Sequence, residues 1–289
     1  MSRIVWLASY PKSGNTWLRA FLANFKRDGD EPININALGV GAGASDRGLF
    51  DSALGVESSD MTEEEIECCR PDAYRYLAAQ SAETLYLKIH DAYTLTSRGD
   101  PLIPADVTSG AIYVTRDPLD VAVSFAHHYS KTLEEAVERI ARDTLTVSAS
   151  TGRLRTQLRQ RLLSWSRHVL SWLDQSAIPV HVMRYEDMSL QPIETFTAAV
   201  RFLGWAEDVD RVRRAVEFSS FEVLRQQEYS HGFKERLHGP LFFRQGRPGA
   251  WREALTREQV ARVIGDHGPV MRRLGYLSES EGVETARCL

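Results

Sequence analysis

Four short runs of mostly apolar residues divide the chain at wide intervals, and each ends at polar or ionisable residues. An apolar run of about four to eight residues is typical of a strand buried on both faces of a sheet. Helical spacing fills the intervals, which favours an α/β fold with a parallel sheet and helices on both faces. The predicted strands cover residues 3–9, 85–89, 111–115 and 179–183.

Recurring apolar residues at helical spacing predict the elements between these strands. One helix has a clear start, because Asp117 is a good N-cap residue and Pro118 is favoured at the first helical position. The predicted helices cover residues 16–25, 119–129, 154–173, 193–202 and 257–264.

Two stretches lack such a pattern. Residues 34–56 contain the glycine-rich sequence GVGAGAS, and residues 229–249 are rich in basic side chains. Segments of this composition are typical of loops that carry function. We expect a single domain over residues 1–289, with mobile insertions at these two places.

The charge balance limits the kinds of partner. The 289 residues include 35 basic and 39 acidic ones, a formal net charge of −4. This balance argues against a nucleic-acid or membrane-surface binder, so an anion site must be local. The chain lacks a signal-peptide pattern and an apolar run long enough to span a membrane. Its three cysteines, Cys68, Cys69 and Cys288, lack metal-ligand spacing, which fits a reducing cytoplasm.

The segment 10–17, YPKSGNTW, lies between the first predicted strand and its helix. There the free N–H groups and the dipole of a helix N-terminus favour an anion. Lys12 adds a positive charge, Ser13 and Thr16 add hydroxyl groups, and Gly14 allows close backbone approach. The lysine precedes the only glycine, so the segment is not a Walker A loop. An ordinary surface turn with a solvated lysine is the structural alternative.

This octet resembles the 5′-phosphosulfate loop of the cytosolic sulfotransferases that use 3′-phosphoadenosine 5′-phosphosulfate (PAPS). The family's usual form is YPKSGTTW, and Asn15 here replaces a threonine while keeping a side-chain donor and acceptor. The resemblance implies a P-loop-like sheet and transfer of a sulfuryl group to a hydroxyl of a small molecule. It also implies 3′-phosphoadenosine 5′-phosphate (PAP) as product and no metal. The opening W-x-A-S-Y-P-K-x-G is similar to bacterial members that sulfate glycopeptide antibiotics.

A second piece of the site follows the third strand. Arg116 offers a permanently charged, planar fork for phosphate, and Ser124 lies eight residues later on the next helix. An ion pair between Arg116 and Asp120 that caps the helix is the structural alternative. The segment R-D-P-x-D-x-x-x-S resembles the family's 3′-phosphate motif, which implies that Arg116 and Ser124 bind this phosphate.

A third piece, RQGRPGAWR at residues 244–252, combines three arginines, two glycines and a tryptophan. A loop that closes over an anion has this composition, and so does a solvated basic loop. It resembles the family's R-K-G-x-x-G-x-W-K signature, which implies phosphate contacts for Arg244 and Gly246. Gln245 stands where lysine is usual, and Arg247 could replace the missing charge.

The family's base pocket implies further contacts. Its Trp, Tyr-Glu-Asp and Ser-Phe positions match aromatic groups at Trp17 and Phe221 and polar groups at Tyr185 and Ser219. Aromatic side chains of this kind are also ordinary core residues.

His90 follows the second strand, at the end of the sheet where α/β folds gather their sites. A neutral histidine can accept a proton from a hydroxyl. Lys88 lies two residues earlier on the same strand face. The sequence K-I-H-D is similar to the family's K-T-H motif, which implies that His90 is the general base and that Lys88 assists. Asp91 could orient His90, although neighbouring strand residues point to opposite faces.

Two rival functions remain open at this level. A kinase on a related P-loop sheet requires a Walker A lysine and Mg²⁺ ligands, and neither is visible in the sequence. A non-catalytic nucleotide-binding protein would not need both Lys12 and His90. Residues 252–256 lack the dimer segment of animal relatives, so we expect a monomer or a homodimer.

Overall fold

The computed structural model describes residues 3–149, 154–236 and 241–278. Its centre is a five-stranded sheet in the order β2-β3-β1-β4-β7, and all neighbouring pairs are parallel. The predicted α/β fold class with its parallel sheet is therefore confirmed. The strands are β1 (Ile4–Ser9), β2 (Ala42–Gly43), β3 (Leu85–Ile89), β4 (Thr108–Thr115) and β7 (Val180–Arg184).

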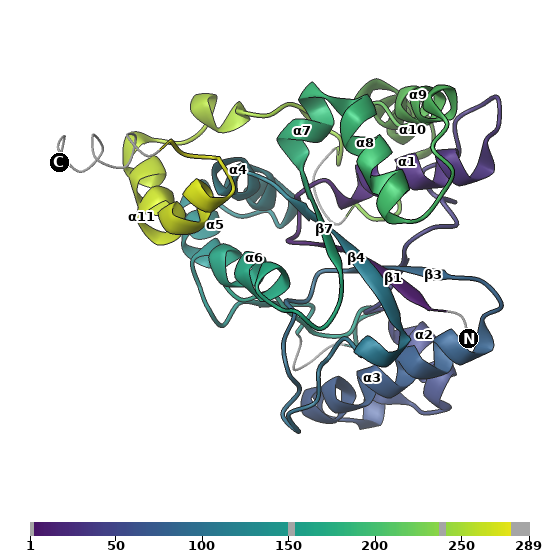
Figure 1. The fold of residues 1–289 in the computed structure, drawn as a ribbon. Helices are drawn as coiled ribbons and strands as arrows, with labels where there is room; N and C mark the ends of the chain where they lie inside the picture. The colour runs from purple at the N-terminus through teal and green to yellow at the C-terminus, as the bar shows by residue number, and fades with distance from the viewer. Residues whose placement is uncertain (1–2, 150–153, 237–240, 279–289) are drawn as a thin grey trace.

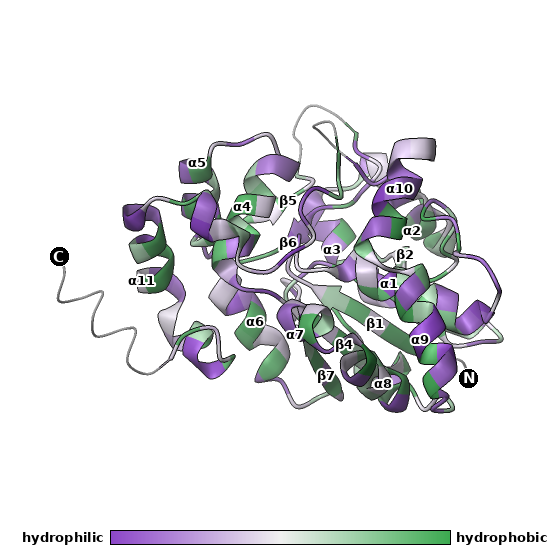
Figure 2. Ribbon diagram, turned by 90° about the horizontal axis from the view of Figure 1, so that it is seen from above, coloured by the Kyte–Doolittle hydropathy of each residue, from purple (hydrophilic) through white to green (hydrophobic). Residues whose placement is uncertain are grey.

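Side chains alternate between two apolar cores, one on each face of the sheet. In β1, Trp6 belongs to one core and Leu7 to the other, and neither is exposed to solvent. The strands are mostly hydrophobic, whereas the helices carry polar and apolar stripes (Figure 2). The Trp6 face packs against α3 (Glu63–Gln80), α4 (Pro118–His128), α5 (Leu133–Ile140), α6 (Trp165–Leu173) and α11 (Arg257–Arg273).

The Leu7 face is covered by a second group of helices (Figure 1). This group consists of α1 (Asn15–Arg27), α8 (Pro192–Phe202), α9 (Val209–Phe218) and α10 (Phe221–His231). Two shorter helices, α2 (Arg47–Leu54) and α7 (Tyr185–Leu190), follow β2 and β7. The predicted start of α4 is confirmed, because Pro118 is its first residue and Asp117 accepts a hydrogen bond from Leu119 N at 2.9 Å.

The predicted helix over residues 154–173 is wrong in its first half, because α6 begins only at Trp165. Hydrogen bonds to distant segments hold the preceding chain extended: Leu158 N donates to Ser45 O at 2.7 Å, and Arg161 O accepts from Ala92 N at 2.8 Å. The short antiparallel strands β5 (Thr146–Val147) and β6 (Gln160–Arg161) also pair here. Tertiary pairing thus overrides the helical pattern.

The interpretation of residues 34–56 as patternless loop is wrong in part. This stretch holds β2 and α2, and Ala44 N donates to Lys88 O at 2.8 Å. A two-residue edge strand owes its conformation to pairing with β3, which local composition does not reveal. Of the other predicted insertion, residues 229–231 end α10 and residues 237–240 lie outside the described part of the chain. The mobility of both segments stays a prediction.

A buried ion pair joins α3 to the chain that follows β3. Arg70 donates to the two carboxylate oxygens of Asp91 at 3.0 and 2.6 Å, and the side chains are 2% and 1% exposed. Arg70 also donates to Tyr74 Oη at 2.9 Å, and Asp91 accepts from Arg161 N at 3.0 Å. The pair therefore fixes the backbone beside His90.

We predict that Arg70→Met lowers the free energy of unfolding by about 3–5 kcal/mol, because Asp91 remains buried without its counter-charge. Arg75→Met on the same helix is the matched control. Arg75 is exposed and pairs with Asp72 and Asp106, so its loss costs about 1 kcal/mol or less. Denaturant unfolding measures both changes. Equal losses in the two variants would contradict a structural role for the buried pair.

Candidate active site

A cavity of about 840 Å³ draws its lining from each of the segments that the sequence singled out. The predicted site residues in this lining are Lys12, Gly14, Asn15, Thr16, Trp17, Lys88, His90, Arg116, Ser124, Tyr185, Phe221, Arg244, Gln245 and Gly246. Ser13 and Ser219 are fully buried and do not line it. Ser219 donates its hydroxyl to Ala215 O at 2.7 Å. The binding roles of all these residues stay predictions.

The turn between β1 and α1 has an unusual backbone. Lys12 and Gly14 have φ values of 72° and 110°, so two residues adopt left-handed conformations within one turn. A Cβ on Gly14 would lie 2.8 Å from Cδ2 of Tyr185, which only glycine avoids. No side chain caps the start of α1. The turn therefore presents helix N–H groups next to a lysine.

Polar atoms in this turn lack protein partners. Asn15 donates to Leu7 O at 2.8 Å and to Ser9 Oγ at 3.3 Å, which ties the turn to the end of β1. Its Oδ1 is buried and has no hydrogen-bond partner among the residues that the structure describes, and the same holds for Ser13 Oγ and Trp17 Nε1. Unsatisfied buried groups are costly in a finished core, so their presence fits a site completed by a polar ligand.

The Lys12 ammonium also lacks a carboxylate partner within the described residues. Its Nζ lies 3.5 Å from the centre of the Phe242 ring. Burial, and then the positive charges of Arg116 and Lys88, lower the pKa of Lys12 to about 7. A bound anion would reverse this shift, because it would stabilise the charged form.

Arg116 connects the β1–α1 turn to the C-terminal loop. Its guanidinium lies 4.1 Å from the centre of the Tyr185 ring and donates to Lys12 O at 3.4 Å and to Arg247 O at 3.3 Å. The ion pair with Asp120 is also present, at 3.6 Å. The two alternatives for Arg116 are thus compatible. Arg116 Nε is buried, and no described residue accepts a hydrogen bond from it.

Arg247 does not replace the charge that Gln245 lacks in this structure. The Arg247 guanidinium forms an ion pair with Glu253 at 2.6 Å and does not line the cavity. The loop around it is held by Asp120, which accepts from Gly249 N at 2.7 Å and from Trp251 N at 3.0 Å. Asp120 therefore positions the C-terminal loop as well as Arg116.

Position 246 requires glycine for two reasons, its backbone conformation and the closeness of the Phe221 ring. Its φ is 63°, and a Cβ would lie 2.2 Å from the Phe221 ring. The same loop is fixed by Glu228, which accepts from Phe242 N at 2.7 Å and from Phe243 N at 2.9 Å. Sequence reasoning missed Glu228, because a glutamate inside an amphipathic helix gives no sign that it is buried.

The hydrogen bonds of His90 define its tautomer. Nδ1 donates to Ser9 O at 2.8 Å, so Nε2 carries the lone pair. Burial, and then the charge of Lys88, hold the pKa of His90 well below its ordinary value. His90 is therefore neutral at pH 7 and can accept a proton. The suggestion that Asp91 orients His90 is wrong, because the Asp91 carboxylate binds Arg70.

His168 is a second histidine of the site region that the sequence did not reveal. Its Nε2 donates to His90 O at 3.0 Å, and its Nδ1 accepts from Tyr113 Oη at 2.8 Å. Burial lowers the pKa of His168 to about 4. This neutral, fully bonded imidazole fixes the backbone of His90 from behind.

Glu235 is the acidic group nearest to Lys88. Its carboxylate pairs with Lys88 Nζ at 2.8 Å and with Arg19 at 2.7 Å. Burial raises its pKa, but Lys88 and Arg19 outweigh burial and lower it to about 2. Glu235 thus stays ionised and links the segment after α10 to α1 and β3. Sequence analysis did not single out Glu235, because residues 229–249 are rich in basic side chains.

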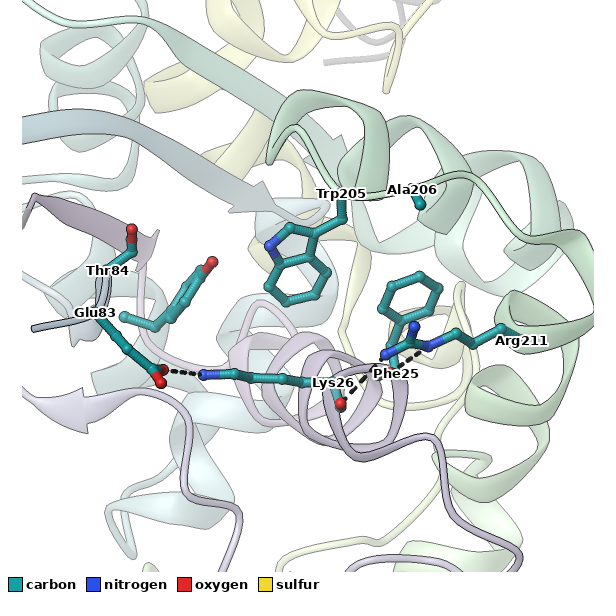
Figure 3. A pocket seen from close by; sticks show the side chains of 8 residues that line it. Phe25, Lys26, Glu83, Thr84, Trp205, Ala206 and Arg211 are labelled. Carbon is teal, nitrogen blue, oxygen red and sulfur yellow. Dashed lines mark hydrogen bonds and ion pairs between the residues drawn. The ribbon is translucent and has the colours of Figure 1, made fainter.

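A second cavity, of about 450 Å³, lies near the amino end of β3 (Figure 3). Its charged side chains already have partners: Lys26 pairs with Glu83 at 3.1 Å, and Arg211 donates to Phe25 O at 2.7 Å. No predicted site residue lines it. Across residues 3–149, 154–236 and 241–278, no group of three or more metal-ligating side chains is placed to hold an ion. In that same part of the chain, no helix could cross a membrane.

The model of the sulfotransferase domain family matches residues 2–275, so this chain belongs to that family. It is 25% identical over 298 residues to cytosolic sulfotransferase 17 of Arabidopsis thaliana, covering 94% of this chain and 75% of that protein. It is 24% identical over 281 residues to sulfotransferase 1A1 of Canis lupus familiaris, covering 93% and 83%. The predicted family is confirmed, and the chain is a sulfotransferase that transfers a sulfuryl group.

Solved structures share the fold. The mouse sulfotransferase SULT7A1 complexed with PAP superposes with a TM-score of 0.61 at 18% identity, covering 99% of this chain and 88% of that one. Retinol dehydratase in complex with androsterone and PAP gives 0.61 at 19% identity, covering 93% and 80%. These matches support the single sulfotransferase-fold domain.

We predict that His168→Asn weakens the pH dependence of folding stability. The unfolded histidine has a pKa near 6.5 and the folded one a pKa of about 4. His168 therefore contributes stability above pH 6.5 that is lost as the pH falls towards 4, at about 1.4 kcal/mol per pH unit. Urea unfolding between pH 7 and 4.5 measures this slope. His231→Asn, in an exposed position, is the control. An unchanged slope in His168→Asn would contradict the assignment.

Proposed function

We propose that this sulfotransferase moves the sulfuryl group of PAPS to a hydroxyl of a small-molecule acceptor. One observation carries the proposal: a single cavity is lined both by Lys12, which has no carboxylate partner among the described residues, and by a neutral His90. Lys12 suits an anionic sulfuryl donor, and His90 suits an acceptor hydroxyl that must lose a proton.

The residues of the cavity fit the nucleotide. Lys12 and the N-terminus of α1 would hold the 5′-phosphosulfate, beside the Ser13 hydroxyl, which has no hydrogen-bond partner among the described residues. Arg116 would bind the 3′-phosphate, and its unpartnered Nε supports this. The further 3′-phosphate residues we propose are Ser124, Arg244, Gln245 and Gly246. Mouse SULT7A1 and retinol dehydratase, which share the fold, are described with PAP.

Aromatic side chains beside this turn suit the adenine. The rings of Trp17 and Tyr185 meet edge to face, with centres 5.7 Å apart, and both line the cavity together with Phe221. Such surfaces can stack on a base or bound its pocket. Ser219 lies directly before the N-cap residue of the helix that carries Phe221. We propose that these residues form the adenine pocket.

His90 is the proposed general base. Its Nε2 would take the proton of the acceptor hydroxyl, while Ser9 O accepts from Nδ1 and stabilises the imidazolium that forms. PAPS, when bound, supplies a sulfuryl group attached to a phosphate leaving group. Lys12 would balance the negative charge that develops at the phosphate end, and Lys88 adds a second cation that Glu235 holds in place.

We predict that His90→Asn lowers turnover by about 10²–10⁴-fold, because the acceptor loses its base. The affinity for PAP should change little. Transfer of radiolabelled sulfate from PAPS to a panel of phenols and alcohols measures turnover, and calorimetry measures PAP binding. His231→Asn, outside the cavity, is the matched control.

Unchanged turnover in His90→Asn would remove this residue from the role of base. The function itself is tested by ligand selectivity in a thermal-shift experiment on the full chain. PAP should stabilise the protein more than ATP or NAD does, and a protein that ignores PAP would contradict the proposed co-substrate.

A further inference from the structure

The lining of the cavity has an unbalanced charge. Seven lysine and arginine side chains of the described residues line it, against the two carboxylates of Asp120 and Glu235. The whole chain has the opposite balance, with a formal net charge of −4. Positive charge is therefore concentrated here rather than spread over the molecule.

Both carboxylates already have cationic partners. Asp120 pairs with Arg116 and accepts two backbone hydrogen bonds, and Glu235 pairs with Arg19 and Lys88. The nucleotide proposed above would use Lys12, Arg116 and Arg244. Three cations of the lining are left over: Arg139, Arg155 and Lys234.

Arg139 differs from an arginine three residues later. Arg142 lies just beyond the end of α5 and pairs with Glu138 on the exposed surface. Arg139 is half-buried in the cavity wall, and no carboxylate in the described part of the chain lies within ion-pair distance. An unpaired guanidinium at a concave, partly enclosed surface is a binding group for an anion.

Arg155 shows the same contrast. Arg159 and Arg161, a few residues later, both pair with Glu67 at 3.1 Å. Arg155 lines the cavity, and its side chain has no such partner among residues that the structure describes. Arg159 and Arg161 are thus partly buried and paired, whereas Arg155, which lines the cavity, is exposed and has no carboxylate partner among the described residues.

Backbone hydrogen bonds connect the segments that carry these two arginines to the chain after His90. The segment that follows Arg155 runs beside the chain after His90, because Ala92 N donates to Arg161 O at 2.8 Å. The chain after α5 is bonded to this segment as well, since Leu162 N donates to Leu145 O at 2.9 Å. The acceptor, whose hydroxyl must reach His90, would meet this wall.

We propose that the acceptor carries a carboxylate besides its hydroxyl, and that Arg139 and Arg155 bind this group. The proposal rests on the function proposed above. Two guanidinium forks at the wall of a partly enclosed cavity favour an anion over a neutral group of the same shape. The attraction between the two arginines and the carboxylate then positions the acceptor hydroxyl at His90, in addition to the shape of the cavity.

Binding to the PAP-loaded full chain tests the charge of the acceptor. The probes share one phenol frame and differ only in the side chain: 4-hydroxyphenylacetate, its neutral amide, and the amine tyramine. A second set, 4-hydroxybutyrate and its amide, repeats the test on an alkanol frame. We expect each carboxylate to bind at least about tenfold tighter than its amide, with tyramine weakest. Equal binding within each set, or no binding by any carboxylate, would overturn the proposal.

Matched variants locate the effect. Arg139→Gln and Arg155→Gln should each lower the ratio of carboxylate to amide affinity by at least about threefold. Arg142→Gln, which removes a paired surface arginine at the end of the same helix, should leave the ratio unchanged. A loss of PAP affinity in Arg139→Gln or Arg155→Gln, with the ratio intact, would assign these arginines to the nucleotide instead.

Different results would contradict the proposed function and the inference about the acceptor. If the wild-type protein does not bind PAP, the proposed function fails. If PAP binds and hydroxyl compounds are sulfated without preference for anions, only the acceptor inference fails. Because binding affinity is measured besides turnover, a slow reaction with these probes does not obscure the result.

Discussion

The site depends on one unpaired ammonium group, that of Lys12, held at the start of a helix. Its backbone is left-handed, its neighbours Arg116 and Lys88 are also cationic, and its Nζ lies 3.5 Å from the centre of the Phe242 ring. Such an arrangement is unfavourable by itself, since burial and like charges both penalise the ammonium. It becomes favourable when an anion enters. In the described part of the chain, the carboxylates of the site are bonded to other groups and do not pair with this cation.

Each carboxylate near the site already has a structural task. Asp120 holds the C-terminal loop and Arg116, Glu228 holds the backbone of Phe242 and Phe243, and Glu235 binds Lys88 and Arg19. None is left to neutralise Lys12. The two histidines near the site add no charge, because His90 and His168 are both neutral. A hydrogen bond from His168 Nε2 to the backbone oxygen of His90 joins them. The cavity therefore combines positive charge with a neutral histidine, as the proposed transfer to a hydroxyl would require.

The sequence predicted the parts of this protein that depend on local patterns. The strands at residues 85–89 and the start of α4 were placed closely, because burial on both faces and helix capping leave marks in neighbouring residues. The cavity lining followed from motifs at the ends of those strands. Pairing between distant segments cannot be recognised from neighbouring residues. The strand β2 depends on its pairing with β3, and the arginine-rich segment before α6 is extended because it forms hydrogen bonds with residues far away in the sequence. Glu235 and His168 were missed for the same reason.

The most direct test of the account is proton uptake when PAP binds at pH 8. With a pKa of about 7, Lys12 is mostly neutral at this pH before binding, and the ligand's phosphates are already ionised. Calorimetry in buffers of different ionisation enthalpy should show uptake of close to one proton per PAP. Lys26→Met, at an exposed position on α1, should leave this uptake intact, whereas Lys12→Met should abolish it. Binding without proton uptake, or the same uptake in Lys12→Met, would contradict the central role of Lys12.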